Sequence, residues 1–229
     1  MKTILACALS LVALPCLADD MTPTLSISAF IATHQTDGGS SSLLQGSVEA
    51  LYPTAYGAAY WQDGEGGWVL PAPAGWVSLG VANEPMWVLG GNVSQNLGVA
   101  RYGFDLPRSG TLSLGYATRI GSSHPGDLLI ANLDQPLAVL GRTQLHLWGW
   151  ASLANGERRQ SLGHEDNGVS WQLEQSNLML VAEQPIWQDW SLIAGIGSRW
   201  VADQGGARTA GWQTLLGVSW NWNANRHDN

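Results

Sequence analysis

The sequence is poor in charge, in lysine and in long apolar runs. Asp, Glu, Lys and Arg make up only 12% of its 229 residues, about half the usual share. The one lysine is Lys2, and a formal net charge of −8 argues against neutralising a nucleic-acid backbone. No apolar run approaches the roughly 20 residues that a membrane-spanning helix needs. With 45% hydrophobic residues, the chain is not an ordinary disordered one either.

Both cysteines lie close to the N-terminus, at Cys7 and Cys16. The lysine at position 2, the apolar stretch 4–14 and Cys16-Leu17-Ala18 before two aspartates predict a cleaved signal peptide over residues 1–18. Lipidation at Cys16 is the alternative, although Pro15 stands where a small residue is expected. Residues 19–229 then form an exported domain without disulfides, which needs another source of stability.

Tryptophan is abundant, with 13 residues against two phenylalanines, and its spacing near the C-terminus is regular. In segments 190–200 and 212–222, apolar side chains alternate with small or polar ones, which predicts strands. Each segment has Trp at both ends of its apolar face: Trp190 and Trp200, then Trp212, Trp220 and Trp222. Ten strand residues tilted by about 40° cover about 25 Å, the height of the apolar band of a transmembrane barrel. Trp is the residue expected at both membrane interfaces.

Weaker alternation over 25–34, 44–52, 112–120 and 144–153 extends this pattern along the chain. We therefore predict an all-β fold, an antiparallel transmembrane β-barrel formed by residues 19–229. Short segments with proline are predicted as turns at one end of the barrel, at 52–54, 83–85, 106–108, 134–136 and 183–185. Longer polar loops, 155–168 among them, alternate with these turns. The hairpins between the turns give about twelve strands, with eight or ten as alternatives.

In such a barrel the face opposite the apolar one lines the lumen. The predicted lumen residues are Glu49, Arg119, Gln144, His146, Arg199, Gln213 and Asn221, with Arg101, Arg142 and Glu174 as further candidates. Inward arginines can bind carboxylates bidentately. The pattern resembles the small porins that take up acidic oligosaccharides, and this resemblance implies an anionic oligosaccharide as solute. The alternative is that Arg119 and Arg199 pair with Glu49 or Glu174 and close the lumen.

Trp148 and Trp150 fall on the same predicted lumen face. There they could stack on sugar rings. A register shifted by one residue would instead turn both of them to the lipid, and the sequence leaves these two alternatives open.

One stretch resembles an enzyme motif. His164-Glu165-Asp166-Asn167-Gly168 is similar to the His-x-Ser-Asn-Gly stretch of outer-membrane phospholipases, but Asp166 stands where those enzymes have their serine nucleophile. We therefore predict no enzymatic activity. The histidines are scattered and the exported domain lacks cysteine, so no metal site is predicted. The glycines follow no nucleotide-binding spacing, and no cofactor is expected.

The predicted function is a narrow channel, or a structural barrel, in the outer membrane of a Gram-negative bacterium. Its expected partners are outer-membrane lipid and the barrel-assembly machinery, which would read the aromatic pattern of 216–222. Two other functions are consistent with the composition. One is a secreted or periplasmic β-sandwich that binds carbohydrate through its tryptophans, and the other is a barrel-embedded lipid hydrolase.

Overall fold

The computed structural model describes residues 22–36, 39–62, 64–83, 96–121, 126–161, 171–202 and 208–223. The predicted signal peptide lies outside these residues. The strands are β1 (Thr24–Thr36), β2 (Gly39–Thr54), β3 (Gly57–Gln62), β4 (Glu65–Ala72), β5 (Gly75–Asn83), β6 (Asn96–Leu106), β7 (Gly110–Arg119), β8 (Asp127–Leu140), β9 (Thr143–Ala154), β10 (Gln172–Trp187), β11 (Trp190–Ala202) and β12 (Arg208–Asn223).

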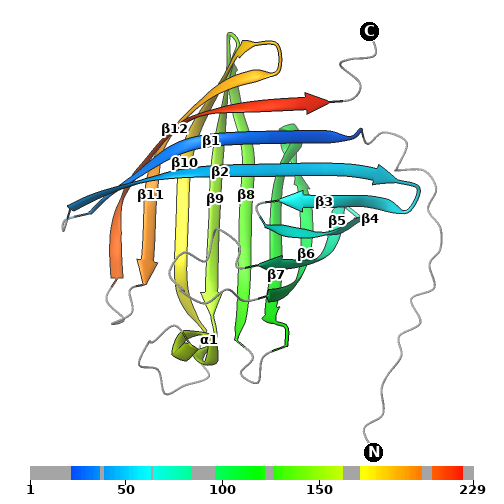
Figure 1. Cartoon of the computed structure of the whole chain (residues 1–229), viewed down its shortest axis with the longest axis vertical. Helices are drawn as coiled ribbons and strands as arrows, with labels where there is room; N and C mark the ends of the chain where they lie inside the picture. The colour runs from blue at the N-terminus through cyan, green and yellow to red at the C-terminus, as the bar shows by residue number, and fades with distance from the viewer. Residues whose placement is uncertain are drawn as a thin grey trace, which may run out of the picture.

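The twelve strands form one closed barrel in which each strand pairs with its neighbours in the sequence (Figure 1). Strand β1 pairs antiparallel with β2 on one side and with β12 on the other, and this second pairing closes the sheet. The predicted all-β barrel and its twelve strands are confirmed. The alternative of a β-sandwich is wrong, because a single sheet closes on itself. Within the described ranges, no helix is long and apolar enough to cross a membrane.

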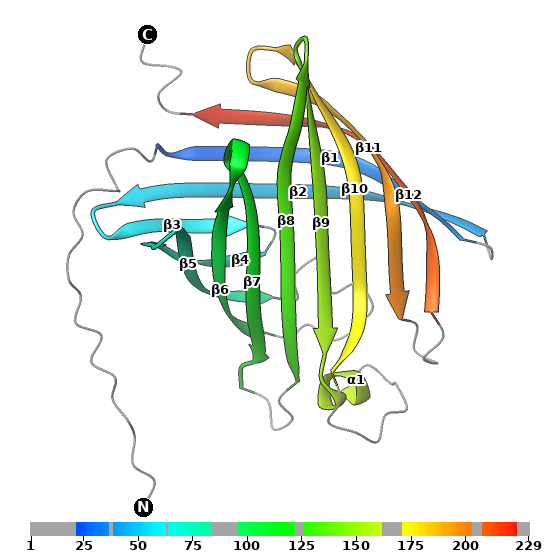
Figure 2. The ribbon, with the colours of Figure 1, turned by 180° about the vertical axis from the view of Figure 1, so that it is seen from behind.

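The two ends of the barrel differ in their connections. At one end, here called the turn end, strands are joined over 54–57, 72–75, 106–110, 140–143 and 187–190. At the other end, called the loop end, the wider connections lie, including the one that carries helix α1 (Gly156–Ser161) (Figure 2). Gly141 has φ +65°, a conformation that suits glycine in the tight turn between β8 and β9.

Two prolines predicted in turns lie inside strands instead. Pro136 belongs to β8 and Pro185 to β10, and each stands beside a register shift in its ladder. The preceding glutamines form matching hydrogen bonds, since Gln135 Nε2 donates to the Pro136 carbonyl at 2.9 Å and Gln184 Nε2 to the Pro185 carbonyl at 3.0 Å. A bulge tolerates proline because it leaves one residue out of the ladder. The turns themselves follow several residues later.

A third turn was predicted at 83–85, of which residues 84 and 85 lie outside the described residues. Strand β5 ends with Asn83 at the loop end, where its N–H donates to the Gly64 carbonyl at 3.1 Å. The corresponding connection at the turn end joins β4 to β5 over 72–75, beside Pro71 and Pro73.

The predicted loop 155–168 contains helix α1, which the sequence analysis missed. Asn155 caps this helix, because its Oδ1 accepts a hydrogen bond from the Arg158 N–H at 2.9 Å. The same Oδ1 accepts the Asp127 N–H at 3.1 Å, and Asn155 Nδ2 donates to Asp127 Oδ2 at 3.0 Å. One asparagine thus fastens α1 to the first residue of β8.

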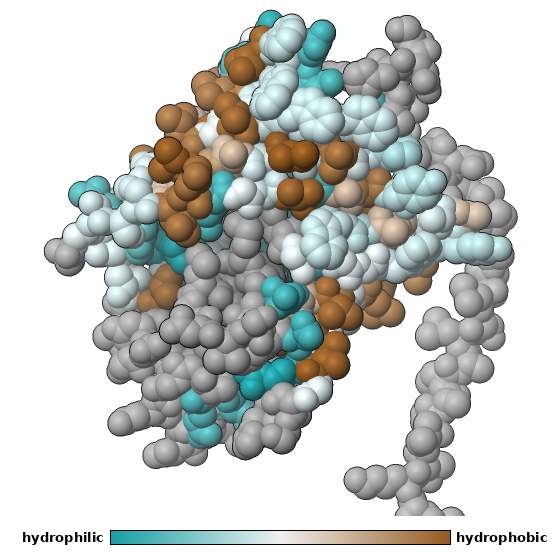
Figure 3. Space-filling view, viewed as in Figure 1, coloured by the Kyte–Doolittle hydropathy of each residue, from teal (hydrophilic) through white to brown (hydrophobic). Residues whose placement is uncertain are grey.

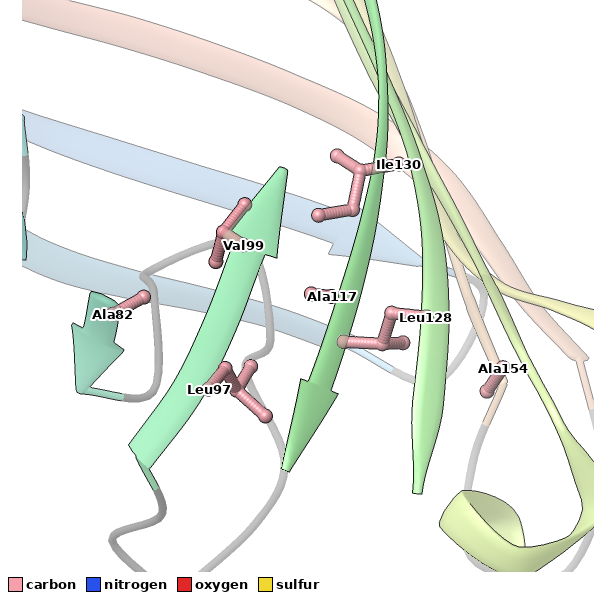
Figure 4. Packing of buried hydrophobic residues seen from close by; sticks show 7 residues of the cluster. All are labelled: Ala82, Leu97, Val99, Ala117, Leu128, Ile130 and Ala154. Atoms are coloured by element: carbon pink, nitrogen blue, oxygen red, sulfur yellow. The ribbon is translucent and has the colours of Figure 1, made fainter. Parts of the chain in front are cut away.

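Buried apolar side chains gather inside the barrel, in two clusters. The first lies at the loop end on β5–β9 (Figure 4) and consists of Ala82, Leu97, Val99, Ala117, Leu128, Ile130 and Ala154. The second, here called the apolar constriction, comprises Met179, Val181, Ile193 and Leu215, with Phe30 and Trp148 packed against it. The protein therefore fills part of its own lumen.

Candidate functional site: the barrel lumen

The outer face of the barrel is apolar and exposed. On β12, Trp212 is 65% exposed and Leu216 59%, whereas Gln213 between them is 7% exposed and points inward. Other strands repeat this alternation, and apolar side chains gather over the β1, β2 and β12 side of the molecule (Figure 3). A surface of exposed Leu, Ile and Val around a closed barrel matches the hydrocarbon core of a membrane rather than water.

All five tryptophans predicted for the membrane interfaces lie on this outer face. Trp200 and Trp212 stand towards the loop end, and Trp190, Trp220 and Trp222 towards the turn end. Trp190 and Trp220 are direct cross-strand partners. The sequence analysis missed Trp187, which is 67% exposed opposite Trp190. Its signal was hidden because the Gln184-Pro185 bulge breaks the alternation just before it.

The inner face carries a buried charged cluster on β3–β6. Arg101 donates two hydrogen bonds to the Glu65 carboxylate, and the Tyr60 hydroxyl donates to the same carboxylate. The side chains of Arg101 and Glu65 are almost entirely shielded from water. A bidentate pair of this kind satisfies both charges, which isolated would be costly to bury. Sequence analysis had proposed Arg101 as a lumen residue but had not identified its partner Glu65.

The structure places four of the charged or histidine residues predicted for the lumen, Glu49, Arg119, His146 and Arg199, on the inner wall. Glu49 is exposed there and accepts a hydrogen bond from Gln62 Nε2 at 3.2 Å. Arg119 pairs across the ladder with buried Leu97, and His146 Nδ1 lies 3.1 Å from Asp134 Oδ1. The fourth is Arg199, on β11.

Arg142 was predicted in the lumen, and this is wrong. It lies exposed in the turn between β8 and β9, because β8 continues past Pro136 to Leu140. The remaining predicted lumen residues lie on the inner face: Arg101, Gln144, Glu174, Gln213 and Asn221.

A second buried ion pair closes part of the loop end. The Arg158 side chain of α1 is buried, and its Nε lies 3.9 Å from Glu174 Oε1. Glu174 is brought inward by the register shift between Leu173 and Gln175. Gly126 lets α1 approach, since a Cβ there would lie 2.9 Å from the Arg158 Cα. The helix therefore packs against the start of β8 and the start of β10.

A polar strip covers part of the inner face of β1–β3 and β12, in contrast to the buried side chains elsewhere on the inner wall. Ser26 Oγ donates to Asn221 Oδ1 at 2.7 Å, and Glu49 with its donor Gln62 continues the strip across β2 and β3. Glu49 and Gln62 are exposed, and Gln45 and Ser47 partly exposed. Within the lumen, water thus has access to hydroxyl, amide and carboxylate groups along this strip.

The register also decides the orientation of two tryptophans. Trp148 pairs with Asp134 and Met179, and Trp150 with Asn132 and Asn177, all of which are inward-facing. Both indoles therefore lie on the lumen side. The phospholipase-like stretch 164–168 lies outside the described residues. Among the residues that are described, no group of three or more His, Cys, Asp or Glu is close enough to hold a metal ion.

Comparisons with known proteins add solved structures of similar architecture. No protein-family model and no curated protein matches the chain. Neisserial surface protein A aligns at 11% identity and TM-score 0.30 over 87% of this chain and 95% of its own. The translocator domain of the autotransporter NalP from Neisseria meningitidis aligns at 12% and 0.40 over 87% and 88%. A porin aligns at 10% and 0.33 over 87% and 99%.

Identities and TM-scores this low transfer no function from these proteins. The fold follows from the chain's own geometry, a closed antiparallel barrel with an apolar outside and a polar strip along part of its inner face. This is the architecture of an outer-membrane β-barrel.

Proposed function

We propose that this chain forms a narrow channel in the outer membrane of a Gram-negative bacterium. The observation that carries the proposal is the polar strip on the inner face of β1–β3, which is accessible to water although the outer face is apolar. A soluble barrel would bury its apolar residues inside and expose polar ones. The exposed apolar outer face and the water-accessible polar strip inside support lipid outside and solute inside.

The filled side of the lumen supports a narrow path rather than an open pore. The apolar constriction occupies the inner face of β10–β12, with Val181 fully buried and Met179 3% exposed. On β3–β6 the Arg101–Glu65 pair fills the inner wall. A solute would pass between them, beside Glu49 and Gln62, so small polar molecules and single-file oligosaccharides are the proposed solutes, acidic ones included.

The proposed location implies two further partners. Outer-membrane lipid would contact the apolar face, with the tryptophan belts at both interfaces. The barrel-assembly machinery would insert the chain, and the outward face of β12 with Leu216, Val218, Trp220 and Trp222 is the proposed recognition strand. We assign no catalytic step to the lumen.

Channel function is tested by reconstitution in planar bilayers. The folded barrel should be recovered from the outer-membrane fraction, and its gel mobility in cold detergent should change on boiling. Single-channel currents should be small, and Glu49→Gln should shift the ion selectivity away from cations because it removes a lumen charge. Glu157→Gln is the control, since Glu157 is an exposed residue of α1 outside the strip.

A structural barrel without conduction is the second candidate. The observation in its favour is the apolar constriction, which could block the passage of water and ions. The absence of any current above the lipid background, for a protein that is folded and inserted, would leave this second function and overturn the first.

A further inference from the structure

Strand β2 is paired along nearly all of one edge but along only part of the other. Its residues 39–51 pair with β1, whereas its pairing with β3 runs only from Glu49, opposite Gln62, to Thr54. Strand β3 has six residues against sixteen in β2, and it runs beside only the turn-end part of β2 (Figure 1). Within the described part of the chain, residues 39–48 thus have no strand on their β3 side. We call this stretch the open edge of β2.

The open edge is uncovered on both faces of the strand. Leu44 on the outer face is 73% exposed, and Leu43 on the inner face is 52% exposed. Leu43 pairs with Ala32 of β1, which has a strand on each side and is buried. A side chain on the inner wall of a closed ladder is shielded by neighbours on both sides. The exposure of Leu43 indicates that β2 lacks this shielding towards β3.

The open edge lies at the depth of the lipid hydrocarbon. Leu44 pairs with Ile31 of β1, which pairs in turn with Leu216 of β12. Leu216 lies midway between Trp212 and Trp220 on the lipid-facing side. With strands about 4.8 Å apart and tilted by about 40°, two steps along such a ladder line change the height by about 6 Å. Leu44 therefore lies inside the apolar band, which is about 25 Å tall.

An unpaired strand edge at this depth cannot face lipid tails, because its N–H and C=O groups would lose water without gaining another partner. Such backbone occurs in membranes only where it is buried in protein or lines a water-filled cavity. The second condition fits this edge, since the polar strip begins there, with Gln45, Ser47 and Glu49 on the inner face of β2. The gap beside β2 therefore joins the hydrated lumen to the lipid.

The lining of this gap changes from apolar to polar over a few residues. On the outer face, Leu44 and Val48 of β2 and Trp61 of β3 are exposed. On the inner face, Glu49 and Gln62 are exposed, and Gln62 Nε2 donates to Glu49 Oε1 at 3.2 Å. Glu49 is the one carboxylate on β1, β2 and β3, and these strands contain no lysine or arginine. A head group that enters from the lipid thus meets negative charge.

We propose that the gap between β2 and β3 is a lateral opening through which the barrel binds a cationic amphiphile, such as a long-chain alkylammonium. The alkyl chain stays in the bilayer, along Leu44, Val48 and Trp61. The ammonium head enters the lumen and lies against the Glu49 carboxylate. Water at the open edge hydrates the backbone groups and the rest of the head. This path leads from the lipid to the lumen, and so it goes beyond conduction across the membrane.

The opening itself is tested with spin labels in phosphatidylcholine vesicles. Both cysteines of the chain lie in the predicted signal peptide, so single-cysteine variants of residues 19–229 carry one label each. Leu44→Cys places the label at the open edge. Thr214→Cys and Val218→Cys are the controls, since they lie on either side of Leu216 on the outer face of β12, which is paired on both edges.

Collisions with a water-soluble nickel complex should be several times more frequent at position 44 than at either control. Oxygen, which concentrates in lipid, should collide mainly with the two control labels. Collisions of the label at position 44 with oxygen alone would mean that lipid covers the edge. Collisions with neither reagent would mean that a second copy or another part of the chain covers it. Either result would overturn the proposal.

The ligand is tested by fluorescence quenching, independently of current. A fluorophore on Ser47→Cys, on the inner face beside Glu49, is titrated in the same vesicles with dodecylammonium and with dodecyl phosphate, each carrying a nitroxide on its head group. The ammonium compound should quench at the lower concentration. Glu49→Gln in this background should raise that concentration by about tenfold, because the charge attraction beside a low-dielectric wall is lost. Quenching by the phosphate should not weaken.

Glu157→Gln is the matched control, since it removes the same charge from an exposed position on α1 and should leave both titrations unchanged. Each variant is first shown to fold by its gel mobility before and after boiling. Equal quenching by the two amphiphiles, or equal quenching of the Glu49→Gln variant and its parent by the ammonium compound, would overturn the proposed ligand. Bilayer currents without quenching would overturn the lateral path alone, while quenching without currents would overturn the channel function alone.

Discussion

Arg101 on β6 binds the carboxylate of Glu65 on β4 with two hydrogen bonds, across the intervening strand β5. Tyr60 on β3 donates to the same carboxylate, so one acidic group links three strands of the inner wall. The barrel wall is shortest here, since β3 has only six residues and β4 eight. Gly-rich strands fix register weakly, and β4 contains Gly66 and Gly67. The buried cluster supplies the missing constraint.

Glu65→Gln should therefore destabilise the barrel. The substitution leaves Arg101 buried without its counter-charge, and removing one partner of a buried pair costs about 3–5 kcal/mol. The free energy of unfolding, measured by urea titration in lipid vesicles, should fall by an amount of this order.

Glu49→Gln serves as control for that measurement, because Glu49 is exposed and its loss should change stability by less than about 1 kcal/mol. The double substitution Glu65→Gln with Arg101→Met should recover part of the loss, because no buried charge then remains. Equal stability of Glu65→Gln and the wild type would show that the cluster does not constrain the wall.

Gly103→Ala tests the packing of the lumen at the turn end. Gly103 is the cross-strand partner of Trp76, and a Cβ at Gly103 would overlap the Trp76 ring. Overpacking of this kind costs about 1–3 kcal/mol. Gly46→Ala is the control, since its Cβ would meet only the Ser28 carbonyl, at 3.7 Å. If Trp76 lies elsewhere in the folded protein, both variants will unfold at the same urea concentration.

Alternation alone was sufficient to predict which face of the strands meets lipid. In β11 and β12, side chains of even number face outward and those of odd number inward, as the placement of Trp190 and Trp212 indicated. Such a pattern survives in the sequence because lipid and lumen impose opposite polarities on successive residues. The strand number was predicted for a less secure reason. Strand β5 ends with Asn83 at the loop end, not at the turn end where a turn was predicted over 83–85, and the turn at 72–75 was missed, so two errors cancelled in the strand count.

Two prolines were wrongly predicted to lie in turns, because proline occurs both in turns and at bulges within a sheet. Beside Pro136 and Pro185 the ladder shifts and continues, whereas Pro53 stands just before a turn. A sequence does not distinguish a bulge from a turn, because both accept a residue without an N–H. Because the turn was predicted at 134–136, Arg142 was predicted to lie in a lumen-facing strand position and not in the turn after Leu140. The ion partners Glu65 and Arg158 were missed for another reason, since neither pairing follows from alternation and both depend on how distant strands close the barrel.

Asn155→Ala should loosen α1 without unfolding the barrel. The substitution removes the cap on the Arg158 N–H and the side-chain hydrogen bonds to Asp127, a loss of about 1 kcal/mol or somewhat more. Hydrogen exchange at the amides of α1 should then accelerate by about tenfold relative to the wild type. Gln172→Ala, at an exposed position nearby, provides the control. Unchanged exchange at α1 would mean that packing on Gly126, and not the cap, holds the helix.

Leu216→Arg tests whether the outer face of the barrel contacts lipid. Leu216 is 59% exposed on β12 and lies four positions from Trp212 and four from Trp220, midway between the two Trp interfaces. An arginine near the middle of the lipid-facing band costs about 2–4 kcal/mol, because its charge must leave water. Gln45→Arg is the control, at a partly exposed position on the lumen side of β2. Unfolding in vesicles should show a large loss for Leu216→Arg and a small one for Gln45→Arg. Equal losses would mean that the two faces meet the same solvent, which is incompatible with a transmembrane barrel.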